Sequence, residues 1–177
     1  MRVNPSIVVS LALVMEHAFG AASPRANGAG IDHITSATLA AALDSTMRSG
    51  SKGVMFRLSD DRHAQYLMNR RTAPSAIELH CEWDDLLFVR AGAGTLSHSR
   101  RVQGPTMYGY GEWRATRLVG PIESTITMGD VVRIPAGTAH QVQPLGDVPL
   151  VYLVVKVRTV EEGVCGSLDA LRRKNGN

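Results

Sequence analysis

Short apolar and alternating segments follow one another along most of the chain and predict a protein built mainly from β-strands. Side chains that alternate between apolar and polar suit a strand with one buried face. Turn-forming residues, among them Ala73-Pro74 and Gly129-Asp130, separate the segments. The pattern predicts strands at residues 54–58, 65–69, 76–81, 86–89, 94–98, 122–127, 131–134, 141–143 and 150–157. Many short strands at this spacing are typical of an all-β sandwich or barrel.

One helix is predicted before the strands, over residues 35–50. Its apolar residues recur at helical spacing, at Leu39, Leu43 and Met47. Ser36 or Thr38 can cap the first turn, and Gly50 follows the end. We therefore expect one N-terminal helix beside an all-β unit.

The start of the chain resembles a secretory signal. Arg2 precedes an apolar stretch at residues 7–15, and small residues then offer cleavage after Gly20 or Ala22. This predicts a secreted or periplasmic protein, although a true start at Met15 would make it cytoplasmic. The expected organisation is a signal peptide at 1–22, a linker at 23–34, the helix at 35–50, a single β-barrel domain at 51–160 and a tail at 161–177.

Composition narrows the class of protein. The chain has 177 residues with 44% hydrophobic content, enough for one sizeable core. Its net charge of +3 comes from 19 basic and 16 acidic residues that are scattered, which argues against a nucleic-acid partner. No apolar run reaches the roughly 18 residues of a membrane-spanning helix.

Two cysteines, Cys81 and Cys165, allow at most one intramolecular disulfide. Export would permit that bond. Separation along the chain says nothing about sulfur geometry, so two independent buried thiols are the favoured expectation.

Ionisable residues crowd an otherwise apolar stretch, "IELHCEWDDLLFVRAG" at residues 77–92. Charged groups are rarely buried unless they are paired or bound to a metal. A metal site, an ion-pair network and an acidic surface turn are all open interpretations. Because side chains alternate along a strand, Glu78 and His80 lie on one face and Cys81 on the other.

A second pattern lies about fifty residues further on, in "GDVVRIPAGTAHQVQP". The spacing of Gly129, Pro135, Gly137 and His140 resembles the second motif of the cupin superfamily. Pro144 stands where that motif normally has asparagine.

The first cupin motif is then expected upstream, and residues 78–92 resemble it with changes. His80 and Gly92 match the motif by type and spacing. Glu78 stands in place of the first histidine, and Asp85 in place of the usual glutamate.

The resemblance implies a jelly-roll β-barrel with a metal at its mouth. Carried over position by position, the ligands would be Glu78, His80, Asp85 and His140. Two imidazoles and two carboxylates favour one divalent transition metal, Mn, Fe or Zn. In the alternative, a metal-free barrel, Glu78 would pair with Arg70, Arg71 or Arg90. Glu82 and Asp84 occupy no motif position, so we expect both acids in a turn.

Two further residues are candidates for substrate binding. Lys156 shares a strand face with Tyr152 and Val154, so it can lie inside the barrel, although such a lysine more often reaches out to water. Glu112 follows the glycine-rich "YGYG", a loop that could cover the opening or pack on a partner subunit.

The resemblance favours a metal-dependent enzyme acting on a small molecule in the barrel. The alternative is a non-catalytic module that binds a sugar or small acid in the same pocket. Small cupins usually pair through strands, so a homodimer is expected. Neither a nucleotide-binding loop nor a serine nucleophile motif is present.

Overall fold

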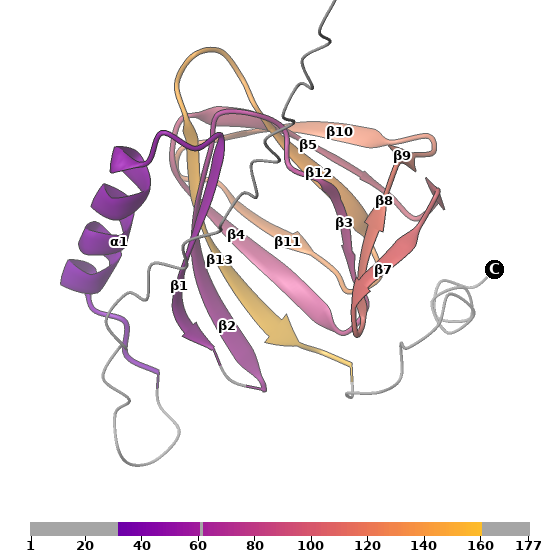
Figure 1. Ribbon diagram of the computed structural model, residues 1–177, viewed down its shortest axis with the longest axis horizontal. Coiled ribbons are helices and arrows are strands. Elements are labelled where there is room, and N and C mark those ends of the chain that lie inside the picture. The colour runs from indigo at the N-terminus through magenta and orange to yellow at the C-terminus, as the bar shows by residue number, and fades with distance from the viewer. Residues whose placement is uncertain (1–31, 61, 161–177) are drawn as a thin grey trace, which may run out of the picture.

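The computed structural model describes residues 32–60 and 62–160, which form one helix and a series of antiparallel strands (Figure 1). The expected signal peptide and tail lie outside the described residues. The elements are α1 (Ser36–Arg48), β1 (Gly53–Asp60), β2 (Ala64–Arg71), β3 (Ile77–His80), β4 (Trp83–Ala91), β5 (Ala93–Ser99), β6 (Val102–Gln103), β7 (Thr106–Gly109), β8 (Glu112–Ala115), β9 (Arg117–Leu118), β10 (Ile122–Thr127), β11 (Val131–Ile134), β12 (Ala139–Pro144) and β13 (Leu150–Arg158).

The strands form two main sheets. One has the order β1-β2-β13-β4-β11 and the other the order β10-β5-β12-β3-β8-β7, while β6 and β9 pair separately. Both main sheets contribute to one apolar cluster, so they pack face to face. The cluster consists of Leu67, Leu87, Val89, Leu96, Ile126, Ile134, Val142, Leu150, Tyr152 and Val154. This arrangement confirms the expected all-β jelly-roll barrel with one helix.

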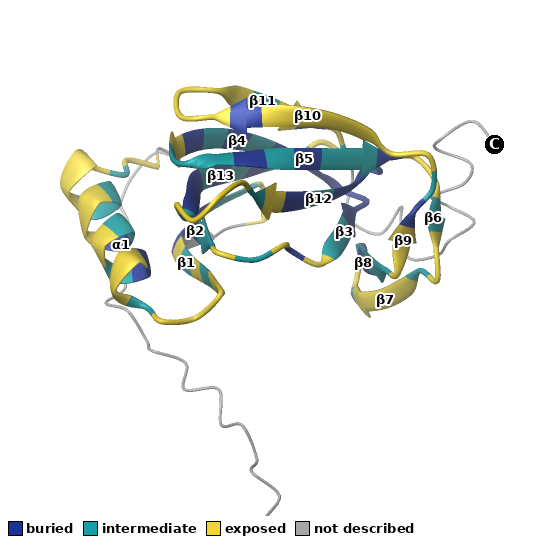
Figure 2. Cartoon of the chain, turned by 90° about the horizontal axis from the view of Figure 1, so that it is seen from above, coloured by how far each residue is buried: buried dark blue, intermediate teal, exposed yellow. Residues whose placement is uncertain are grey.

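Alternation along β13 shows how the sequence builds two layers from one strand. Tyr152 and Val154 point into the cluster between the sheets. Val151 points to the other side, where it packs with Met68 and Ala42 of the helix. In Figure 2, α1 presents its exposed side to solvent at one end of the barrel. The helix therefore covers the outer face of the five-stranded sheet.

The cap of α1 differs from the expectation. Thr35, rather than Ser36 or Thr38, is the N-cap, and its hydroxyl accepts a hydrogen bond from the backbone N–H of Thr38 at 3.1 Å. The helix ends at Arg48, since the backbone N–H of Ser49 bonds to Thr46 O at 3.3 Å. Several hydroxyl residues are adjacent here, so the sequence offered more than one acceptor for the free backbone N–H groups of the first helical turn.

Four short strands were not expected from the sequence: β6, β7, β8 and β9. They are only two to four residues long, so they carry little periodic signal. The glycine-rich segment expected as a loop is in fact the turn of the β7–β8 hairpin. Gly111 stands in that turn with φ of 69°, a conformation that glycine adopts without strain.

Cys81 corrects the expectation of two separate thiols. It is disulfide-bonded and fully buried in a small cluster with Leu79, Trp113, Leu118 and Ala139. The other cysteine, Cys165, lies outside the described residues. None of the helices in the described part of the chain has the length and apolar character needed to cross a membrane.

Candidate metal centre

Strand β3 divides its side chains between core and cavity. Leu79 packs into the apolar cluster around Trp113, whereas Glu78 and His80 face the opposite side, as the alternation in the sequence predicted. The register then brings partners beside them, because Glu78 pairs with His140 of β12 and His80 pairs with Glu112 of β8. The two histidines of the cupin-like motifs therefore meet across adjacent strands.

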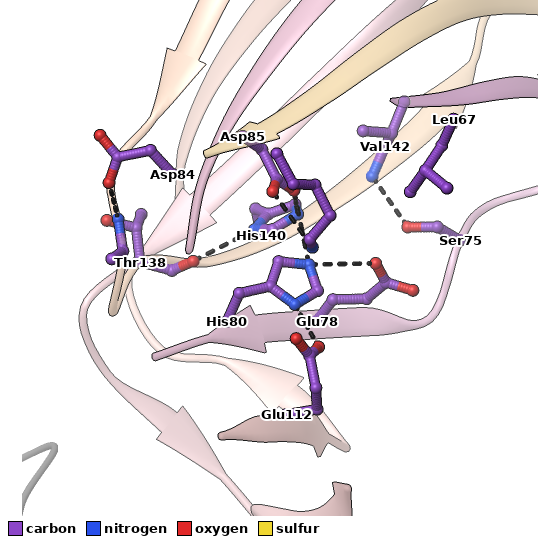
Figure 3. Close-up of polar contacts among 12 residues, drawn as sticks. Leu67, Ser75, Glu78, His80, Asp84, Asp85, Glu112, Thr138, His140 and Val142 are labelled. Carbon is purple, nitrogen blue, oxygen red and sulfur yellow. Dashed lines mark hydrogen bonds and ion pairs between the residues drawn. The ribbon is translucent and has the colours of Figure 1, made fainter. Parts of the chain in front are cut away.

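The Nδ1 atom of each imidazole ring has a hydrogen-bond partner. His80 Nδ1 is hydrogen-bonded to the carboxylate of Glu112, and His140 Nδ1 lies 3.1 Å from the carbonyl oxygen of Thr138 (Figure 3). The ring centroids are 5.4 Å apart. An acceptor at Nδ1 fixes the ring and its tautomer, which leaves Nε2 of each ring facing the cavity.

The two Nε2 atoms face carboxylates. His80 Nε2 lies 3.6 Å from Glu78 Oε2 and 3.4 Å from Asp85 Oδ2, and His140 Nε2 lies 3.6 Å from the same Asp85 oxygen. One donor atom each from Glu78, His80 and His140 falls within 4.8 Å of the others, a group that could hold a metal ion. Asp85 is outside that group of three but borders both imidazoles.

Asp85 enters from the opposite sheet, in strand β4. Its direct neighbour in the register is Lys156 of β13, and the Nζ of this lysine lies 3.1 Å from Asp85 Oδ1. That oxygen nevertheless has no hydrogen bond in the described structure, so the contact is an ion pair with poor hydrogen-bond geometry. Asp85 thus keeps a buried oxygen with unused capacity to accept or coordinate.

Lys156 lies inside the barrel and not at its surface. Its side chain is 8% exposed, as is expected of a residue on the same face as Tyr152 and Val154. The sequence allowed this position but favoured a lysine that reaches out to water. The carboxylate of Asp85 on the adjacent strand compensates for the burial of the ammonium group.

The close packing of these ionisable groups shifts the pKa values of His80, Glu78 and His140. Burial favours a neutral His80, but the charge of Asp85 and the hydrogen bonds that the ring donates to Glu112 and Glu78 outweigh it and raise the pKa of His80 to about 9. Burial also favours a neutral Glu78, yet the hydrogen bond from His80 and the charges of His80 and Arg114 lower the Glu78 pKa to about 2. Burial lowers the pKa of His140, which keeps that ring neutral.

Glu82 and Asp84 are not the solvated turn acids that the sequence suggested. Both are buried. Glu82 pairs with Arg158, and Asp84 accepts hydrogen bonds from Arg133 Nε at 2.7 Å and from the backbone N–H of Ala136 at 2.8 Å. Sequence spacing could not reveal these partners, because they come from β11, from the turn after it and from β13. The two acids therefore link the start of β4 and the residue before it to β11 and β13.

The cavity in front of the imidazoles has a volume of about 280 Å³. Its walls include both substrate-binding candidates, Glu112 and Lys156, and all four expected metal ligands. Sequence reasoning gave no role in the cavity to several polar wall residues: Asn69, Arg71, Arg114 and Tyr152. The alternation of β2 was the available signal, since Asn69 and Arg71 share the face of the core residue Leu67.

No protein-family model matches the chain, and no curated protein matches it. The structure is similar to that of a hydroquinone 1,2-dioxygenase in complex with Cd²⁺ and 4-hydroxybenzonitrile, with a TM-score of 0.51, 15% identity and coverage of 76% of this chain and 83% of that chain.

Two further solved structures are similar. One is an uncharacterised conserved protein with a double-stranded β-helix domain from Klebsiella pneumoniae, with a TM-score of 0.48, 13% identity and coverage of 71% of this chain and 89% of that chain. The other is a sugar phosphate isomerase of the cupin superfamily from Silicibacter pomeroyi, with a TM-score of 0.44, 24% identity and coverage of 68% and 64% respectively. With its two facing antiparallel sheets, the chain has the double-stranded β-helix fold of the cupin superfamily, as its motifs indicated.

Proposed function

We propose that the protein binds one divalent transition metal ion, Mn, Fe or Zn, and acts as a metal-dependent enzyme on a small molecule in the barrel. One observation carries the proposal. Both imidazoles are anchored through Nδ1 and turn Nε2 toward the same carboxylate oxygen of Asp85, with Glu78 beside them. This is the arrangement in which histidines ligate metals, with a second partner fixing each ring.

The donor set fits such an ion. Glu78, His80 and His140 would be its first ligands, and Asp85 can contribute Oδ2, the oxygen that faces both Nε2 atoms. Mixed imidazole and carboxylate ligands suit Mn, Fe and Zn. The dioxygenase of the same fold was solved with Cd²⁺, which supports the proposal through the shared fold alone.

When bound, the ion would polarise a substrate oxygen or activate water or dioxygen. The chain's own residues would do the rest. Glu112 holds the His80 ring in place and stays partly exposed to the cavity, so it can accept a proton from a bound molecule. Lys156 sits beside Asp85 and limits the negative charge that Asp85 presents to the cavity.

Metal binding should strengthen with rising pH. The pKa of His80 is raised to about 9 in the metal-free protein, so at pH 7 this ring is protonated and must lose its proton to coordinate. Between pH 6 and 8 we expect Mn²⁺ affinity to rise about tenfold per pH unit, with release of about one proton. His140 adds little, because its lowered pKa already keeps it neutral. Calorimetric titration in buffers of different ionisation enthalpy measures both quantities, and a pH-independent affinity would contradict the assignment of His80 as a ligand.

The second candidate is a non-catalytic module that binds a sugar or small acid. Its supporting observation is that the cluster can balance its charges without a metal. A protonated His80 lies among Glu78, Asp85 and Glu112, and Lys156 and Arg114 pair with two of these acids. Ligand binding that persists with no metal bound at any pH would favour this candidate.

We further propose that the protein is exported and forms a homodimer. The signal-like leader and the disulfide at Cys81 both suit an oxidising compartment. Ile122, Met128 and Val131, on edge strands and the turn between them, are exposed apolar side chains that a second copy could cover. N-terminal sequencing from the native host and light scattering test these two points, and a chain that retains Met1 or a monomeric mass would contradict them.

A further inference from the structure

The cavity is layered along strands β2 and β13, whose register is continuous. Lys156 pairs with Gln65, Val154 with Leu67 and Tyr152 with Asn69, followed by Leu150 with Arg71. All of these except Leu150 line the cavity. The walls therefore change from ionic beside the metal centre, through an apolar band, to a second polar zone. Tyr152 lies four residues from Lys156, which corresponds to about 13 Å of strand.

Arg71 provides the positive charge of the second polar zone. It is partly buried, and its Nε donates a hydrogen bond to the hydroxyl of Tyr152 at 2.8 Å. Within residues 32–60 and 62–160, no carboxylate pairs with Arg71. Two other cations of the cavity wall behave differently, because Lys156 pairs with Asp85 and Arg114 with Glu78. The guanidinium of Arg71 is thus held in position with its remaining N–H groups available to a ligand.

Two neighbours add polar capacity to the same zone. Asn69 is 5% exposed, and its side-chain amide makes one long contact of 3.5 Å to Leu67 O. Tyr152 is buried, and its hydroxyl accepts from Arg71 while its own proton remains to be donated. Buried polar groups with so few protein partners usually face a ligand or ordered water.

The chemistry of this zone matches a carboxylate. A guanidinium presents a planar fork that binds a carboxylate through two parallel hydrogen bonds. The apolar band formed by Leu67, Leu87, Val142 and Val154 suits a hydrocarbon segment next to that group.

We propose that Arg71, supported by Asn69 and Tyr152, forms a carboxylate-binding subsite at the end of the cavity away from the metal centre. The ligand is then a small organic acid with an apolar middle. An oxygen group at its other end faces Glu78, His80 and His140, and this last part rests on the proposed metal function.

The test compares acids with their neutral amides. The probes are 4-hydroxybenzoate and 4-hydroxycinnamate, two lengths of the same chemistry, each paired with its primary amide. Binding to the full chain is measured by calorimetry, with and without Mn²⁺. The variants are Arg71→Gln, Arg71→Lys and Tyr152→Phe, and Arg117→Gln is the control because Arg117 is exposed on β9 and does not line the cavity.

At least one acid should bind the wild type about tenfold or more tightly than its amide. Arg71→Gln should remove that preference, Arg71→Lys should reduce it because lysine lacks the fork, and Arg117→Gln should leave it unchanged. Tyr152→Phe should weaken it less than Arg71→Gln does. Thermal unfolding confirms that each variant folds, and Arg71→Lys decides the matter if Arg71→Gln does not fold.

Three results would each overturn the subsite. The wild type could bind acid and amide with equal affinity, it could bind neither acid, or Arg71→Gln and Arg71→Lys could keep the wild-type preference for the acid. The two proposals fail separately. If the protein binds no Mn²⁺ but prefers the acid in a way that depends on Arg71, the metal function is wrong and the subsite stands. If it binds Mn²⁺ without preferring the acid, the subsite is wrong and the metal function stands.

Discussion

Replacement of His80 or His140 by alanine is expected to abolish stoichiometric metal binding and to leave the β-rich fold in place. Each ring contributes an Nε2 that faces the shared centre, so its loss removes a nitrogen donor that no neighbouring side chain replaces. The fold should persist because the main apolar cluster lies between the sheets and contains neither histidine. Asp85→Asn and Glu78→Gln should weaken binding less, since an amide oxygen can still approach the ion.

His98 provides the matched control. It is the register partner of His140 on β5, yet it does not line the cavity. His98→Ala should therefore keep the wild-type metal content. Metal per chain is measured by elemental analysis after reconstitution with Mn²⁺, Fe²⁺ or Zn²⁺, and circular dichroism confirms the fold. Full metal content in both His80→Ala and His140→Ala would show that the cluster is a polar network.

Loss of Glu82 should cause a large fall in stability. Glu82 is 2% exposed, and its carboxylate lies 2.5 Å from Arg158 Nη1. Arg158 also stacks on Trp83, with its guanidinium carbon 4.5 Å from the ring centroid. Glu82→Ala would leave this guanidinium largely buried without its carboxylate, and breaking such a pair typically costs about 3 kcal/mol of unfolding free energy. The pair is internal to the fold, so the loss should appear in metal-free protein.

Urea unfolding of metal-free protein measures this effect. Glu123→Ala is the control, because Glu123 is exposed and its carboxylate bonds only to Ser97 at 3.0 Å among the described residues. Its free energy of unfolding should change by no more than about 0.5 kcal/mol. Equal, small effects of the two substitutions would mean that Glu82 is solvated in solution, as the sequence alone had suggested.

The sequence predicted the strands best where both faces of a strand are patterned. In β13, Tyr152 and Val154 alternate with Val151, and in β3 Glu78 and His80 share a face by the same rule. A strand as short as β8 offers too little sequence to be recognised, although Glu112 and Arg114 face the cavity and Trp113 the apolar cluster on the other side. Its neighbours β3 and β7 hold it in place. Glu112 was accordingly expected in a loop, and its hydrogen bond to His80 was not foreseen.

The residues of the candidate site that lie close together in the sequence were predictable, and those that come from distant strands were not. Glu78 and His80 are two residues apart, whereas Asp85 and Lys156 meet them only because the two sheets face each other. Resemblance to the cupin motifs supplied Asp85, and the alternation of β2 placed Arg71 on the same face as Leu67 without indicating its role. Pairing between distant strands decides which partners a buried charge meets, and a single sequence does not encode that pairing in local pattern.

Elemental analysis of wild-type protein, purified without an affinity-metal column, tests the metal centre most directly. At pH 8, where the His80 proton competes less strongly, we expect about one Mn, Fe or Zn ion per chain, either as purified or after reconstitution. Less than a tenth of an equivalent under both conditions, with no metal-dependent rise in thermal stability, would contradict the account and leave the cluster around His80 as an internal ion-pair network.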